Sequence, residues 1–246
     1  MAAAPTVHSG TSAQPAQHNA RRVFLTAAAL GTAAFLSDLV PGTPGAVLLT
    51  LTSSGFAWGV TALFAGFRQK TRGSAVLAGT ATLLIATVIY YFMILVISQR
   101  WRGGYFQDGS SADVSGLLSV GRAAAFWAIA SLCAGPLLGF VGWKARAGSD
   151  RESALIIGAA FGLLSANGFH TLIFQTPGIR LGEVGVHFLL SRLLTIILSA
   201  IATLYLLRRR RISPATGTFV ISAVLSVFAG LLLWRLAELA RVLVSI

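Results

Sequence analysis

Apolar residues run along this chain in long blocks, each close to the roughly 20 residues that a helix needs to cross a bilayer core. Such runs predict an all-α, polytopic transmembrane bundle of about seven spans. They lie at about Val23 to Val40, Ala46 to Phe67, Ser74 to Ser98, Ala123 to Trp143, Ser153 to Phe174, Gly185 to Leu207, and Thr218 to Trp234 with an amphipathic extension. Polar residues between Thr50 and Gly55 interrupt the second run. Residues 46–67 are therefore either a full span or a re-entrant or interfacial piece, which would leave six spans.

The segments between the runs predict a simple organisation. Residues 1–20 are small and polar without apolar periodicity, which predicts a disordered cytoplasmic tail. Residues 21–246 are expected to form a single transmembrane helical domain. The stretch from Gln99 to Arg122 is predicted to be a long outer loop, with Trp101, Tyr105 and Phe106 suited to the lipid headgroups.

Basic residues alternate by side between the runs and set the orientation. The clusters are Arg21 and Arg22; Arg68, Lys70 and Arg72; Lys144, Arg146 and Arg151; and Arg208 to Arg211. With seven spans all four clusters fall on one side, so the positive-inside rule predicts an amino terminus inside and a carboxy terminus outside. Arg21-Arg22 also resembles the core of a twin-arginine export signal, but the later apolar runs favour the anchoring role.

Composition supports the same class. The chain is 55% hydrophobic and 11% charged, and its mean hydropathy is +0.78. These values indicate an integral, multi-pass membrane protein, which we expect in the cell membrane. The net charge of +12 sits in short clusters between the runs, so no nucleic acid is expected as a partner. The single cysteine, Cys133, excludes an internal disulfide.

Ionisable residues inside the predicted spans are costly in lipid and therefore mark a candidate ligand site. Helical rise places them in the outer half of the spans. The candidates are Arg192, His187, Glu183, His170, Asn167, Asp38, Arg235 and Glu238. Glu183 and His187 are four residues apart and can share a helix face. Asp38 and Glu238 are the expected partners of Arg192, but snorkelling of this arginine to the headgroups or a purely structural ion pair is an equally open explanation.

Other chemistries find little support. A haem or copper site at His170 and His187 would lack further ligands, so neither a metal nor a cofactor is expected. A retinal protein requires a lysine in its last span, and this chain has none there. No phosphate loop, zinc-protease segment or nucleophile elbow is present. An intramembrane enzyme with His170 or His187 as general base would need a nucleophile or metal that the sequence does not supply.

Small residues recur at four-residue spacing in three spans: Ala29 and Ala33, Gly135 and Gly139, and Gly158 and Gly162. Such faces allow helices to approach closely in lipid. Packing within the chain is the default explanation, and a partner subunit is the alternative.

Several short motifs lie in the predicted spans: Ser54-Gly55-Phe56-Ala57-Trp58, Gly66, Tyr90-Tyr91, and Trp127 with Gly135-Pro136-Leu137-Leu138-Gly139. Together they resemble a family of multispanning bacterial membrane proteins of unassigned function. The resemblance implies a fold type and a membrane location, and carries no catalytic residues. The Ala29 and Ala33 spacing is also similar to the docking face of substrate-binding subunits in energy-coupling-factor vitamin transporters, which typically have six helices.

Two function hypotheses follow. The first is a noncatalytic membrane protein that binds or transports a small or lipidic anionic ligand in an outer-leaflet polar pocket, with Arg192 as the charge anchor. The second is a noncatalytic accessory subunit that packs against another membrane protein. The expected partners are accordingly the lipid bilayer, a small anionic or lipidic ligand, and a membrane-protein partner.

Overall fold

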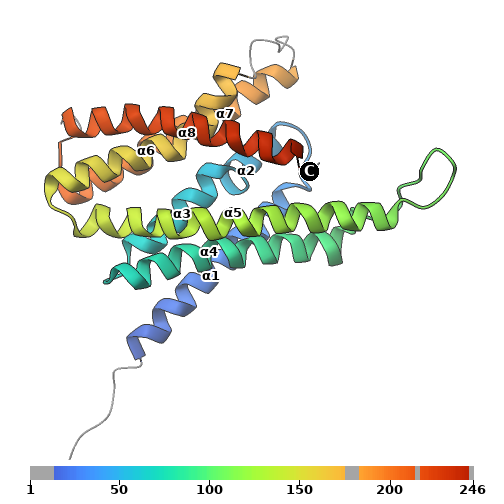
Figure 1. Ribbon diagram of the computed structural model, residues 1–246, viewed down its shortest axis with the longest axis horizontal. Coiled ribbons are helices and arrows are strands. Elements are labelled where there is room, and N and C mark those ends of the chain that lie inside the picture. The colour runs from blue at the N-terminus through green and yellow to red at the C-terminus, as the bar shows by residue number, and fades with distance from the viewer. Residues whose placement is uncertain (1–13, 175–182, 214–216, 244–246) are drawn as a thin grey trace, which may run out of the picture.

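A computed structural model describes the backbone of residues 14–174, 183–213 and 217–243, and the side chains of those ranges except 14–18 and 183–188. The described chain is all-α, as the apolar runs predict (Figure 1). Its elements are α1 (Gln14–Ser37), α2 (Gly42–Thr52), α3 (Gly55–Phe67), α4 (Arg72–Met93), a π-helical turn η1 (Ile94–Ser98), α5 (Asp113–Ala147), α6 (Asp150–Phe174), α7 (Glu183–Arg210) and α8 (Gly217–Leu243).

Six helical segments are long and apolar enough to cross a membrane, which makes the chain a multi-pass membrane protein. They are Gly42–Phe67, Arg72–Ser98, Asp113–Ala147, Asp150–Phe174, Leu189–Arg210 and Gly217–Leu243. The first combines α2 and α3, so the interrupted run is long enough to be a span. The helix α1 is not among the six, and Arg21 and Arg22 lie within its bounds.

Two element boundaries differ from the sequence prediction. The long outer loop was expected to continue to Arg122, but α5 begins at Asp113, so the loop ends at residue 112. The thickness of the hydrocarbon sets the length of an apolar run but not the length of the helix that contains it, so a helix can begin before its apolar run. Likewise α1 begins at Gln14, inside the segment for which the sequence predicts no structure.

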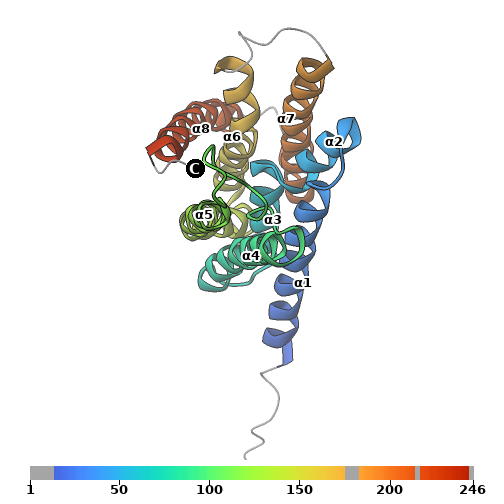
Figure 2. The ribbon, with the colours of Figure 1, turned by 90° about the vertical axis from the view of Figure 1, so that its right-hand side faces the viewer.

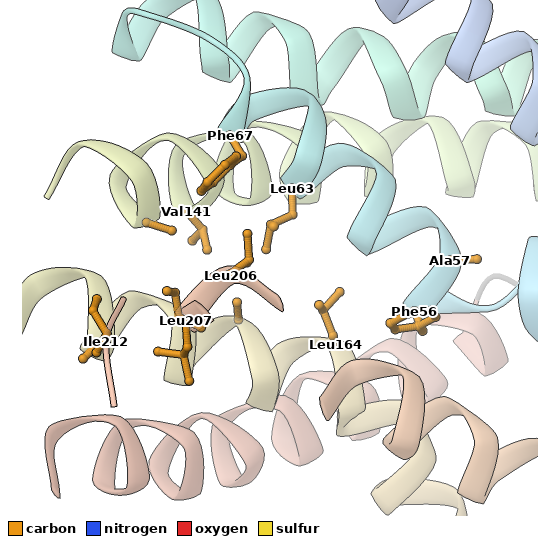
Figure 3. Packing of buried hydrophobic residues seen from close by; sticks show 13 residues of the cluster. Phe56, Ala57, Leu63, Phe67, Val141, Leu164, Leu206, Leu207 and Ile212 are labelled. Atoms are coloured by element: carbon orange, nitrogen blue, oxygen red, sulfur yellow. The ribbon is translucent and has the colours of Figure 1, made fainter. Parts of the chain in front are cut away.

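The helices form two groups joined by α3. In Figure 2, α1, α4 and α5 lie in the lower part, α6, α7 and α8 lie in the upper part, and α3 is between them. A cluster of buried residues fills the junction: Leu63 and Phe67 of α3 face Val141 of α5, and Leu206 and Leu207 of α7 lie opposite (Figure 3). Helix α3 and a direct contact between α5 and α6 thus hold the two groups together.

Glycine allows the closest helix contacts. A Cβ added at Gly139 would lie 2.2 Å from the backbone oxygen of Ala75, and one at Gly135 would lie 2.6 Å from the Cα of Thr80. On α6, Gly158 and Gly162 meet the α8 backbone in the same way. Both glycine faces therefore pack within the chain, as the default explanation predicts.

The loops with basic residues gather at one end of the bundle, on the left in Figure 1. Here Arg146 donates to the backbone oxygen of Gln69, and Arg210 donates to that of Gly148 at 2.7 Å. The indole of Trp143 donates to the Lys70 oxygen at 3.4 Å. We call this the basic end. The loop of residues 99–112 and the last turns of α8 lie at the opposite end, which we call the distal end. The last three basic clusters therefore lie at one end of the bundle, as the sequence predicts.

Candidate functional site

A break divides the first of the six spans at Ser53 and Ser54. The Ser54 hydroxyl accepts a hydrogen bond from the Ala57 amide at 3.2 Å and caps α3, and the same oxygen lies 2.6 Å from the Thr50 carbonyl oxygen, to which it donates. The indole of Trp58 donates to the Thr52 carbonyl at 2.9 Å. These contacts satisfy backbone groups that a continuous helix would pair internally, which is a condition for irregular backbone at membrane depth. The break is therefore a stable part of the fold, because side chains supply the hydrogen bonds that the helix lacks there.

Beside this break lies a cavity of about 350 Å³ between α3, α4, α5, α6 and α8. The lining combines five aromatic residues with leucines and small residues. It consists of Ser53, Ser54, Gly55, Trp58, Gly59, Leu83, Tyr90, Tyr91, Trp127, Ala130, Ser131, Ala134, Leu137, Leu138, Leu163, Leu164, Leu233 and Trp234. No charged side chain belongs to the described lining. Such a wall suits an apolar or aromatic ligand body.

Some polar groups of the cavity wall form hydrogen bonds within the described chain, and others form none there. The Ser131 hydroxyl donates to the Trp127 carbonyl at 2.8 Å and lies 3.1 Å from the Thr87 hydroxyl. By contrast, the indole N–H groups of Trp127 and Trp234 and the Tyr91 hydroxyl have no hydrogen-bond partner within the described chain. Aromatic side chains with an unused polar tip fit ligands that carry both apolar and polar parts.

One cluster of charged residues stands behind Tyr90. The Tyr90 hydroxyl donates to Oδ2 of Asp38 at 2.6 Å, and Nη1 of Arg100 lies 3.0 Å from the same oxygen. Asp38 follows the last turn of α1, and Arg100 follows η1, so the cluster fastens α1 to the distal end of α4. Asp38, predicted to pair with Arg192, is thus held by Tyr90 and Arg100.

A second cluster of charged residues lies one helical turn beyond Trp234 on α8. His170 is 1% exposed, and its Nε2 lies 3.5 Å from Oε2 of Glu238. Arg235 reaches the same carboxylate oxygen at 3.4 Å. Because Glu238 follows Trp234 by one helical turn, this cluster joins α6 to α8 on the same face of α8 as Trp234.

Asn167 and Arg241 lie at the margin of the lining. The Asn167 amide nitrogen lies 4.0 Å from the position that a Cβ on Gly55 would take, and Trp234 lies 2.9 Å from it. The Arg241 guanidinium stands over the Trp127 ring, 5.9 Å from its centroid. Arg241 therefore brings a positive charge next to an aromatic wall residue.

The remaining candidates belong to α7. Arg192 is half-buried, and its backbone oxygen lies 3.0 Å from the position of a Cβ on Gly168, where α6 and α7 cross closely. Glu183 and His187 lie on α7, but their side chains are outside the described residues. The structure thus brings together His170, Glu238 and Arg235, and places Asp38 separately; none of the eight candidates belongs to the described lining of the cavity.

The sequence did not lead us to the residues that line the cavity, because we selected the candidates for their charge. The missed signal lies in the motifs that carried the family resemblance: Ser54, Gly55, Trp58, Tyr90, Tyr91 and Trp127 all line the cavity. These motifs are brought together from α3, α4 and α5.

The described side chains include no group of three His, Cys, Asp or Glu residues placed to hold a metal ion. No protein-family model, no curated protein and no solved structure matches this chain.

Proposed function

We propose that the protein binds a lipidic amphiphile in the aromatic cavity and performs no chemistry on it. The observation that carries this proposal is the cavity of about 350 Å³ at a break in a membrane span, with a described lining free of charge. Pockets of this volume, mostly apolar with a few polar groups, are typical of small-molecule sites.

The proposed ligand has an apolar body and a polar, anionic head. The body contacts the leucines and aromatic rings of the wall, where removal of apolar surface from water or headgroups is favourable. The head accepts hydrogen bonds from the unused indole N–H groups of Trp127 and Trp234. Arg241, stacked on Trp127, supplies the nearby positive charge. This assigns the anion contact to Arg241 in place of Arg192, which does not belong to the described lining.

The cavity opens beside Ser53 and Ser54, where a span is discontinuous. Broken helices line the substrate sites of many transporters, so binding in this cavity serves either transport or sensing. Both versions share the binding step, which is the part that can be tested directly.

The test fills the cavity and leaves its wall in place. Ala134 lines the cavity and is only partly buried, so Ala134→Phe adds a ring to the space without removing a contact. Ala125→Phe is the matched control, because Ala125 is exposed on the same helix. Native mass spectrometry on protein extracted gently from its own membrane identifies the bound species. We expect a reproducible amphiphile on the parent and on Ala125→Phe, and none on Ala134→Phe. An adduct of equal occupancy on all three proteins, or none on the parent, would contradict the proposal.

A membrane-protein partner remains the second candidate, and Ala29 is the observation that favours it. The Gly135–Gly139 and Gly158–Gly162 faces are occupied inside the chain, whereas Ala29 is exposed on α1. A partner that docks there should be lost from Ala29→Leu in co-purification, while the folded protein and its bound amphiphile remain. Unchanged co-purification would remove this support.

A further inference from the structure

The basic end carries more positive charge than its own carboxylates can neutralise. Asp150 and Glu152, in the first turn of α6, are the acidic residues that the described structure places at this end. Glu152 pairs with Lys144 at 2.8 Å, and Asp150 lies 3.8 Å from Arg210. Among the described basic residues of this end, Arg146 has no carboxylate partner and is half-buried, where it donates to the Gln69 backbone oxygen. The others without a carboxylate partner in the described structure are exposed: Arg68, Lys70, Arg72, Arg151, Arg208, Arg209 and Arg211.

Arg209 differs from its neighbours because two aromatic residues hold it in place. Its Nη1 donates to the Tyr205 hydroxyl at 2.9 Å, and its guanidinium stands over the Phe67 ring, 5.9 Å from the centroid. Phe64 in turn contacts Tyr205 at 5.9 Å and Phe67 at 6.3 Å between ring centroids. A guanidinium ordered in this way loses less entropy when it binds an anion, and its planar fork matches a phosphate.

The surface beside Arg209 is apolar and faces outward. Tyr205 is 48% exposed, its neighbour Leu204 is 40% exposed, and Ile201, one turn further into the span, is 56% exposed. Arg209 itself lies in the last turn of α7, where a span meets the headgroup region. The positive charge of Arg209 therefore lies at one end of an exposed apolar strip formed by Tyr205, Leu204 and Ile201.

We infer that Arg209 and Tyr205 form a binding site for the headgroup of an anionic phospholipid at the basic end. The phosphate contacts the Arg209 guanidinium, the Tyr205 hydroxyl donates to a phosphate oxygen, and the acyl chains lie along Leu204 and Ile201. Arg68, which follows Phe67 in the chain, adds charge at the same junction of α3 and α7. Phospholipid is the occupant that uses both the charge and the apolar strip; free phosphate would use only the charge.

The test compares two arginines of equal charge. Arg209→Gln removes the ordered guanidinium, and Arg211→Gln removes an exposed guanidinium two residues away that has no aromatic contact in the described structure. Full-length protein in neutral detergent is titrated with phosphatidylglycerol or phosphatidylcholine, and bound lipid is counted by native mass spectrometry. We expect phosphatidylglycerol to bind the parent more tightly than phosphatidylcholine, and Arg209→Gln to weaken that binding about tenfold more than Arg211→Gln, since a charge-assisted hydrogen bond contributes about 1.5 kcal/mol.

Tyr205→Phe provides a milder variant that keeps the ring and removes only the hydroxyl. It should retain the folded state and still weaken phosphatidylglycerol binding relative to the parent. Equal losses for Arg209→Gln and Arg211→Gln would mean that charge alone attracts lipid, and would overturn the inference. Equal binding of both lipids, or displacement of phosphatidylglycerol by inorganic phosphate, would overturn it as well.

Discussion

The contact between α4 and α5 at Gly139 gives the sharpest stability prediction. A Cβ at this position would lie 2.2 Å from the Ala75 backbone oxygen and 3.3 Å from the Gly79 Cα. Because the obstructing atom belongs to the backbone, no side-chain rotation relieves the overlap, and α4 must move away from α5. Overpacking of this kind costs about 3 kcal/mol at the upper end of its usual range. Replacement of a helical glycine by alanine returns about 1 kcal/mol. Gly139→Ala should therefore lose about 2 kcal/mol in total.

Gly121 on the same helix is the matched control, because no atom lies within 4 Å of the position that its Cβ would take. Gly121→Ala should leave stability unchanged or raise it by up to about 1 kcal/mol. The free energy of unfolding of both variants can be measured by titration with a denaturing detergent. If Gly139→Ala is as stable as Gly121→Ala, the close approach of α4 and α5 is wrong.

Two further predictions concern the distal end and the orientation. Asp38→Asn removes the charge that binds Tyr90 and Arg100, so it should lower the free energy of unfolding by about 1 to 2 kcal/mol in the same detergent titration. Tyr90→Phe removes only one hydrogen bond and should cost less, about 0.5 to 1 kcal/mol. A larger loss for Tyr90→Phe than for Asp38→Asn would contradict this order. The positive-inside rule places the basic end inside the cell. In a Cys133→Ser background, Ser110→Cys should therefore react with a membrane-impermeant maleimide on intact cells, and Lys70→Cys should react only after lysis. The reverse labelling pattern would contradict this orientation.

The spans could be predicted because lipid imposes one requirement on every crossing segment, a long apolar run. The run from Ser153 to Phe174 gives α6 to within its first turn. The start of α5 could not be found in this way, since its first turns lie outside the apolar run and lipid places no constraint on them. The polar interruption at Ser53 and Ser54 did signal a real break, because a hydroxyl next to the backbone can replace helical hydrogen bonds.

The site was harder to predict because its wall is assembled from five helices whose registers the sequence does not fix. Charge led to His170, Glu238 and Asp38, which do not line the cavity. Asp38 instead accepts a hydrogen bond from the wall residue Tyr90, and Glu238 lies one turn from the wall residue Trp234. The aromatic wall residues resemble ordinary packing residues in sequence, because a tryptophan in a span fills a core or lines a cavity equally well. Only the relative placement of α3, α5 and α8 distinguishes the two.

Binding in the aromatic cavity is tested most directly by tryptophan fluorescence, since Trp58, Trp127 and Trp234 all line the cavity. Bromododecanoate is an anionic amphiphile whose bromine quenches nearby indoles. Titration should give saturable quenching in the parent and in Ala125→Phe, and only the weak, linear quenching of lipid-exposed tryptophans in Ala134→Phe. Weaker quenching by the uncharged bromododecanol would support a contact between the anionic head and Arg241. Equal, non-saturating quenching of all three proteins would contradict a ligand site in this cavity.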